Sequence, residues 1–277
     1  MHTKSELSAL LRAHGLRLNK RLGQHYLIDP HMCRKLVRSC RLTKANAVVE
    51  IGSGLGALTD LLAADAKRVI AIEVDRAICE ALKQRMAALP NVEVRHQDVQ
   101  RFDWAAHAGH VAVGALPYCL TSPILVALCD HAGEISRAWF GVQREVAQRL
   151  AARPGTKAYG RLTVLVQYHF DVRVMMPIPR GAFFPQPEVD SSWIELRARP
   201  KGFVPVKDEA MLFELVRAAF SQRRKTLVNC LQQLKAPRLS REQAVAVLAD
   251  AGLPERVRGE ALSIAQFARL ADLLSQR

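Results

Sequence analysis

Residues 50–59 read Glu50-Ile51-Gly52-Ser53-Gly54-Leu55-Gly56-Ala57-Leu58-Thr59. The apolar run 47–49 precedes this stretch, and the amphipathic stretch 58–66 follows it. This order predicts a strand, a glycine turn and the start of a helix. Glycines permit the positive φ angles of such a turn and let a ligand approach the backbone, and a helix N-terminus offers free N–H groups. The stretch therefore predicts either a nucleotide-binding βα unit or a purely structural glycine turn.

A second apolar run favours the nucleotide-binding alternative. Residues 68–72 read Arg-Val-Ile-Ala-Ile and predict a strand that leads into Glu73. An acidic residue about 20 positions after the first glycine, at the end of the second strand, can accept hydrogen bonds from ribose hydroxyls. We therefore expect an adenosine ligand, with its ribose held by Glu73.

The spacing of the glycines indicates which adenosine ligand. A dinucleotide site usually has the spacing G-x-G-x-x-G, whereas this chain has G-x-G-x-G directly after Glu50. A carboxylate there suits a cationic ligand better than a pyrophosphate, and S-adenosylmethionine carries a sulfonium and an α-ammonium group. The apolar run 92–94 predicts a third strand that leads to Asp98, whose carboxylate can accept a hydrogen bond from the adenine amino group. We expect S-adenosylmethionine, with NAD as the less favoured alternative.

The positive charge is concentrated at the two ends of the chain. The net charge is +14. Residues 1–45 contain ten Lys and Arg against two acids, residues 46–200 contain 17 against 16, and residues 201–277 contain 13 against eight. This distribution predicts a phosphate-rich partner that both basic ends contact, or otherwise a merely solvated surface.

The six cysteines form no C-x-x-C pair and no Cys/His zinc spacing, so we predict no metal site. The sequence shows no signal-peptide pattern and no apolar run near 18 residues long. We expect a reduced, cytoplasmic protein without a membrane segment.

The periodicity predicts two domains. Strands and helices alternate from about 47 to 180, and residues 190–197 predict a last strand. Residues 200–206, with a glycine and two prolines, predict a linker, and only helical periodicity follows it. We predict a doubly wound, Rossmann-like α/β domain at 1–200 with a basic N-terminal segment, and a small all-helical domain at 206–277.

Two aromatic residues stand in proline-containing loops. Tyr118 ends the run Leu116-Pro117-Tyr118, which follows a predicted strand at 110–113, and Phe183 stands two residues before a second proline. Each run is consistent with an ordinary proline turn. Together, two aromatic rings on rigid loops favour a slot for a flat nucleobase that is extruded and stacked.

The chain resembles the rRNA adenine N6,N6-dimethyltransferases of the KsgA type, with the erythromycin-resistance methylases as relatives. The resemblance covers nearly the whole chain. It rests on Lys20-Arg21-Leu22-Gly23-Gln24, residues 50–59, Glu73, Asp98, Leu116-Pro117-Tyr118, Ala158-Tyr159-Gly160-Arg161-Leu162, residues 183–191, and Phe220-Ser221-Gln222-Arg223-Arg224-Lys225-Thr226. The last run favours the KsgA type over the resistance methylases.

The resemblance implies a function and a set of site residues. It implies dimethylation of two adjacent adenosines in a hairpin near the 3′ end of small-subunit (16S) rRNA, within an immature 30S subunit, by a monomer. It implies cofactor contacts at His25, Leu27, Gly52, Gly54, Glu73, Asp98 and Ala115. It implies an adenine site at Ala115, Leu116, Tyr118 and Phe183, and RNA contacts at Lys20, Arg21, Arg223, Arg224 and Lys225.

The chain departs from the family pattern at two positions. It has Ala115 where the family has asparagine before Leu-Pro-Tyr, and His25 where the family usually has asparagine after Gly-Gln. Two acceptors, the asparagine side chain and the next backbone carbonyl, would hold the adenine amino group. Losing one such acceptor typically costs about 10²–10³ in rate. Imidazole at position 25 can still donate or accept.

Ala115 leaves three explanations open: an inactivated engineered enzyme, a natural relative with lost or altered activity, or an enzyme that finds its second acceptor elsewhere. It also favours an alternative function, a weakly catalytic or non-catalytic RNA-binding ribosome assembly factor. The motif regions contain no serine or cysteine nucleophile beside a base, which disfavours a hydrolase.

Overall fold

The computed structural model describes residues 3–16, 24–200, 203–222, 224–234 and 236–276. The chain folds into two compact units, Met1–Ala147 with Asp171–Ala198, and Gln148–Phe170 with Arg199–Arg277. None of the helices in the described part of the chain combines the length and apolarity needed to span a membrane.

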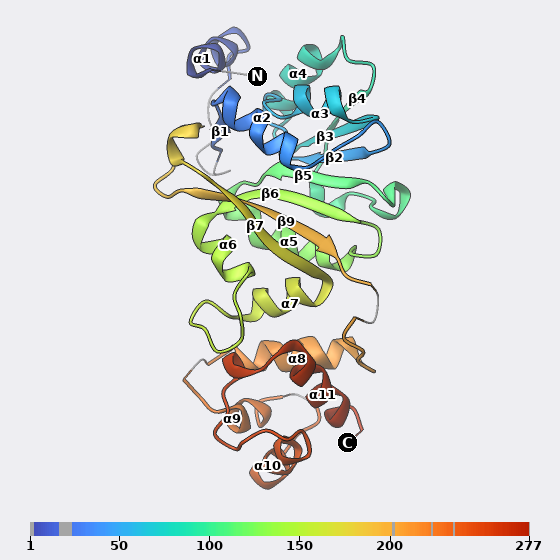
Figure 1. Ribbon diagram of the computed structural model, residues 1–277, viewed down its shortest axis with the longest axis vertical. Coiled ribbons are helices and arrows are strands. Elements are labelled where there is room, and N and C mark those ends of the chain that lie inside the picture. Colours follow the sequence, from blue (N-terminus) through green and yellow to red (C-terminus); the bar gives the residue numbers. More distant parts are fainter. Residues whose placement is uncertain (1–2, 17–23, 201–202, 223, 235, 277) are drawn as a thin grey trace. The chain divides into compact units, whose positions relative to one another are not determined.

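The described residues contain nine strands and eleven α-helices (Figure 1). The strands are β1 (Tyr26–Leu27), β2 (Ala47–Ile51), β3 (Arg68–Glu73), β4 (Val92–His96), β5 (Val111–Ala115), β6 (Arg137–Gln143), β7 (Phe170–Ile178), β8 (Phe183–Phe184) and β9 (Ser191–Ala198). The helices are α1 (Lys4–Ala13), α2 (Pro30–Ser39), α3 (Thr59–Asp65), α4 (Arg76–Met86), α5 (Thr121–Asp130), α6 (Arg144–Leu150), α7 (Arg161–His169), α8 (Glu209–Ala219), α9 (Leu227–Leu231), α10 (Arg241–Asp250) and α11 (Ile264–Leu274).

The first unit is built on a seven-stranded sheet with the order β4-β3-β2-β5-β6-β9-β7. The strands β4, β3, β2, β5 and β6 pair in parallel, and β9 pairs antiparallel with β6. The buried strands β2 and β3 are almost wholly apolar, as expected for parallel strands covered on both faces. The predicted doubly wound α/β sheet is confirmed, including its last strand.

The strand order reverses between β2 and β5. The chain proceeds from β2 outward to β3 and β4, then returns to the other side of β2 to form β5. In open α/β sheets, ligands bind in the crevice at the carboxyl ends of the strands where the order reverses. The glycine run follows β2, and residues 116–118 follow β5, so this topology brings the two motifs together.

A short two-stranded ribbon joins segments far apart in the sequence. Strands β1 and β8 pair antiparallel, with Leu27 opposite Phe183, and the Ile28 N–H donates to the Ala182 carbonyl at 2.8 Å. Leu27, Ala182 and Phe183 are buried in the same apolar cluster as β2 and α2. The ribbon therefore fixes the chain directly after residue 25 and at residue 183.

The second unit has its own apolar core. Leu212 and Leu215 of α8 are buried in one cluster with residues from α9, α10 and α11. Tyr159 and Val164, which precede and begin α7, are buried in this same cluster. Residues 148–170 therefore group with the C-terminal helices, whereas the sequence pattern predicted that they belong to the domain 1–200. The change of unit after Ala198 lies beside the expected linker at 200–206.

Candidate functional site

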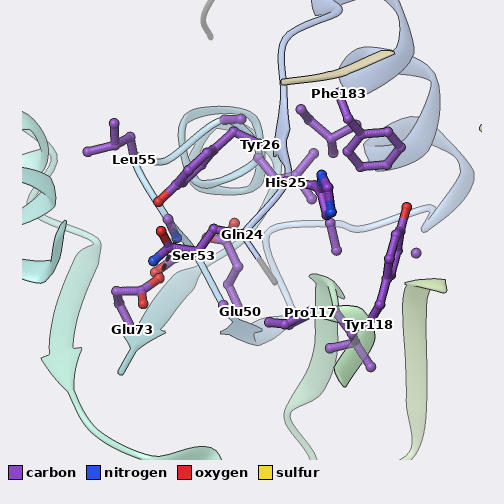
Figure 2. A pocket seen from close by; sticks show the side chains of 18 of the residues that line it. Gln24, His25, Tyr26, Glu50, Ser53, Leu55, Glu73, Pro117, Tyr118 and Phe183 are labelled. Atoms are coloured by element: carbon purple, nitrogen blue, oxygen red, sulfur yellow. Dashed lines mark hydrogen bonds between the residues drawn. The ribbon is translucent and has the colours of Figure 1, made fainter. Parts of the chain in front are cut away.

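A pocket of about 980 Å³, part of it open to solvent, lies at the carboxyl ends of β2 and β5. The glycine loop, residues 115–118 and the segment 24–27 all contribute to its lining. Figure 2 shows an acidic end with Glu50 and Glu73, and an aromatic end with His25, Tyr118 and Phe183.

Glu73 is held at the acidic end by the backbone. Its carboxylate accepts the N–H of Gly54 at 2.8 Å on one oxygen and the N–H of Asp75 at 2.9 Å on the other. Burial nevertheless raises the pKa of Glu73 above its ordinary value. A carboxylate oxygen accepts more than one hydrogen bond, so both oxygens keep capacity for hydroxyl donors from a ligand.

Glu50 is the second carboxylate of the acidic end, and its side chain is almost completely buried. The residue is 2% exposed, and the Thr59 hydroxyl donates to its carboxylate at 2.5 Å. Burial raises the pKa of Glu50 to about 8. Bringing a cation into the pocket would favour the ionised form of this group.

The glycine loop needs glycine at position 54. Gly54 has φ +55°, and a Cβ there would lie 2.8 Å from the ring of Tyr26. Tyr26 lines the pocket beside the loop, and Leu7 of α1 lines it as well. Leu7 packs in a small apolar cluster with Leu55. The helix α1 therefore forms part of the pocket wall.

A second hollow of about 550 Å³ adjoins the pocket. It shares Gly52 and Pro117 with the pocket and is lined by Asp98. One oxygen of the exposed Asp98 accepts the N–H of Gln100 at 3.0 Å. Because the two hollows share lining residues, Asp98 adjoins the pocket that contains Glu73.

Three aromatic side chains line the aromatic end. Tyr118 and His25 stack with their ring centroids 5.2 Å apart and their planes at 29°. The Tyr118 hydroxyl forms a 2.7 Å hydrogen bond with Ser191 of β9, and burial raises the pKa of Tyr118. The His25 Nδ1 donates to the Pro185 carbonyl at 2.7 Å. Phe183 lies beside His25 and Tyr118 in Figure 2.

Ala115 and Leu116 connect the acidic and aromatic ends. Both line the pocket, and the Leu116 N–H donates to the Gly141 carbonyl at 3.0 Å. The methyl side chain of Ala115 offers no hydrogen-bond acceptor. The pocket thus collects His25, Leu27, Gly52, Gly54, Glu73, Ala115, Leu116, Tyr118 and Phe183, while Asp98 lines the adjoining hollow.

The expected RNA-binding residues are only partly described. Arg224 and Lys225 are exposed in the second unit. Lys20, Arg21 and Arg223 lie outside the described residues. These five positions stay predictions.

Three pocket features were not predicted from the sequence. The contact of Leu7 with the pocket follows from the packing of α1, although the apolar stripe of that helix is visible in the sequence. Tyr26 is an aromatic residue directly after the Gly-Gln-His run, which is a usable signal. The bond from Ser191 to Tyr118 spans 73 residues and has no signature in the sequence.

A family model described as ribosomal RNA adenine dimethylase matches residues 15–276. The ribosomal RNA small subunit methyltransferase A of Geobacillus thermodenitrificans is 40% identical over 98% of this chain and 96% of its own length. The protein of the same name from Shouchella clausii is 38% identical over 98% of this chain and 95% of its own length.

Two solved structures are also similar. A dimethyladenosine transferase from Plasmodium falciparum has a TM-score of 0.74 and 26% identity, covering 87% of this chain and 94% of its own. The 23S rRNA methyltransferase ErmE has a TM-score of 0.68 and 27% identity, covering 91% of this chain and 100% of its own. With the family model matched over nearly the whole chain, this protein belongs to the ribosomal RNA adenine dimethylase family.

Proposed function

We propose that this chain transfers methyl groups from S-adenosylmethionine to the N6 amino groups of adenosines in small-subunit rRNA. The observation that carries this proposal is the pocket itself, in which a carboxylate-lined end and an aromatic end meet beside the Leu-Pro-Tyr turn. The family and the names of the 40% and 38% identical relatives support the same reaction.

The residues present fit S-adenosylmethionine. Glu73 has hydroxyl-accepting capacity for the ribose, and one oxygen of Asp98, which has no hydrogen bond within the described residues, can accept from the adenine amino group. Glu50 supplies a negative charge once a bound cation lowers its pKa. Gly52 adjoins both hollows, which leaves room for a ligand against the backbone. The bound cofactor supplies an electrophilic methyl group on a positively charged sulfur.

Residues of this chain bind and orient the target adenine. Tyr118 and Phe183 stack on the extruded adenine, and the Leu116 carbonyl accepts a hydrogen bond from its amino group. The lone pair of that nitrogen is delocalised into the ring, so it is a weak nucleophile. Orientation by preorganised groups is therefore the main source of rate enhancement.

The proposal also specifies the target site, the cellular location and the oligomeric state. We place the target at two adjacent adenosines in a hairpin near the 3′ end of 16S rRNA within an immature 30S subunit. The enzyme acts in the cytoplasm as a monomer. The KsgA-type motif runs and the basic ends of the chain support the rRNA target.

The direct test is methyl transfer to immature small subunits. With labelled S-adenosylmethionine, nucleoside digests should yield N6,N6-dimethyladenosine from small-subunit rRNA. The alternative of a non-catalytic assembly factor predicts tight subunit binding without label in the rRNA. Mature, already dimethylated subunits are the matched control, because they should bind less and accept no label.

Glu73→Ala should weaken S-adenosylmethionine binding about 10- to 150-fold, because a charge-assisted hydrogen bond contributes roughly 1.5–3 kcal/mol. Calorimetry with S-adenosylhomocysteine and its 2′-deoxy analogue separates ribose recognition from loop collapse. The native chain should prefer the ribose form, and Glu73→Ala should lose that preference. An unchanged preference would remove Glu73 from the ribose site.

Neutralising the run at 223–225 should flatten the salt dependence of RNA binding. Each lost phosphate contact reduces the slope of log K against log salt by about one, so replacing Arg223, Arg224 and Lys225 by glutamine should reduce it by about two to three. The matched control replaces Arg68, Lys83 and Arg173, because each forms an ion pair with a nearby acid. Equal slopes for the two triple variants would contradict the role of this run.

A further inference from the structure

His25 is placed at the aromatic end of the pocket by contacts on two sides. Its ring stacks on Tyr118, and its Nδ1 hydrogen-bonds to the Pro185 carbonyl, 160 residues away in sequence. The ribbon of β1 and β8 begins at the next residue, where Tyr26 lies opposite Phe184, and fixes the backbone on one side of this bond. His25 is therefore an ordered wall residue in the same pocket as Ala115 and Leu116.

The bond to Pro185 decides which ring nitrogen carries the proton. A backbone carbonyl can only accept, so Nδ1 must donate. In the neutral imidazole the other nitrogen, Nε2, then holds an in-plane lone pair. Within the described part of the chain, no hydrogen bond to Nε2 is present. The pocket thus contains an acceptor of fixed tautomer beside the aromatic slot.

The reaction needs such an acceptor. The adenine amino group carries two N–H bonds, and orienting its lone pair toward a methyl donor requires both to be held. The Leu116 carbonyl can hold one of them. The side chain at position 115 cannot hold the other, because it is a methyl group.

We propose that Nε2 of His25 is the second acceptor for the amino group of the target adenine, and that it replaces the acceptor missing at position 115. This inference rests on the proposed adenine methylation. It makes His25 a catalytic residue, because its ring nitrogen contacts the reacting group, whereas the family resemblance implied a cofactor contact.

The proton balance is consistent with this role. As the N6 lone pair bonds to the methyl carbon, the sulfur keeps the electron pair of the broken bond and becomes neutral. The nitrogen then carries a positive charge and releases one proton. Nε2 receives that proton along the hydrogen bond already formed and passes it to water, while Nδ1 stays bound to the Pro185 carbonyl.

A double-mutant cycle between positions 25 and 115 tests the inference. His25→Phe keeps a ring on Tyr118 and removes the acceptor, so it should lower kcat about 10²–10³-fold in the native chain. Ala115→Asn alone should change kcat less than about tenfold. When Asn is present at position 115, His25→Phe should lower kcat less than about tenfold, because two residues that perform the same function have non-additive effects. Equal losses in both backgrounds would overturn the inference. A large gain of kcat on Ala115→Asn with His25 in place would also overturn the inference, because it would show that the native chain lacks the second acceptor.

Two readouts do not depend on turnover. The affinity for S-adenosylhomocysteine, measured by calorimetry, should stay the same in His25→Phe, and a large loss would assign His25 to the cofactor instead. In ¹⁵N-histidine spectra with S-adenosylhomocysteine bound, adenosine should shift the Nε2 resonance of His25. Purine riboside lacks the amino group and should not shift this resonance. Identical shifts with both nucleosides would overturn the contact. If all variants fail to transfer methyl, the proposed function is wrong, and the nucleoside titration still decides the contact.

Discussion

Tyr118→Ala should lower methyl transfer about 10²–10³-fold while leaving cofactor binding intact. Stacking of a base on an aromatic ring contributes roughly 1–3 kcal/mol, and a reacting group displaced by about 1 Å can lose about 10² in rate. The ring of Tyr118 also carries the stacked His25, so its removal disturbs both partners of the base. Single-turnover transfer to immature subunits, with calorimetry of S-adenosylhomocysteine, measures the two effects separately.

Tyr118→Phe is the matched control. It keeps the ring and removes only the hydroxyl that bonds to Ser191. Its loss should be less than about tenfold, the cost of one neutral hydrogen bond. Ser191→Ala should have the same effect, and the double variant should be no worse than either, because all three remove one bond. Native turnover in Tyr118→Ala would show that the base stacks elsewhere.

The sequence predicted the parts of the site that depend on local pattern. The strand ends before Gly52 and at Glu73 follow from apolar runs, and topology alone places their carboxyl ends at one edge. For the same reason the Leu-Pro-Tyr turn, which follows β5, was predictable beside the glycine loop. The doubly wound sheet and its last strand are confirmed on this basis.

Contacts between distant segments could not be predicted in this way. The bonds from Ser191 to Tyr118 and from Pro185 to His25 join residues that no periodicity relates. The segment 148–170 is a similar case. Its apolar residues Tyr159 and Val164 predict burial, but the pattern does not specify which apolar cluster receives them. Only the fold shows that this cluster belongs to the C-terminal helices.

The raised pKa of Glu50 links folding to pH. Its ordinary value is 4.5, and burial raises the pKa to about 8. Between these values the folded chain binds one more proton at this group than the unfolded chain. The free energy of unfolding therefore falls as pH rises through this window. Glu50→Gln should remove this contribution, since the amide does not titrate.

Binding of S-adenosylmethionine should release a proton from Glu50. The cationic ligand favours the ionised carboxylate and so lowers the pKa of Glu50. In the free chain, burial raises this pKa most, the charges of Asp60 and Glu73 raise it further, and Arg85 lowers it. Affinity should therefore increase from pH 6 toward about 8, by up to tenfold per pH unit, and level off above the pKa of the free chain.

Calorimetry in buffers of different ionisation enthalpy counts the released proton. At pH 7 the native chain should release up to one proton per cofactor, and Glu50→Gln should release fewer and bind with a flatter pH dependence. Thr59→Val is the matched control, because it removes only the hydroxyl that donates to Glu50 and should keep the proton release. If Glu50→Gln releases as many protons as the native chain, the released proton comes from another group, and Glu50 does not receive the positive charge of the cofactor.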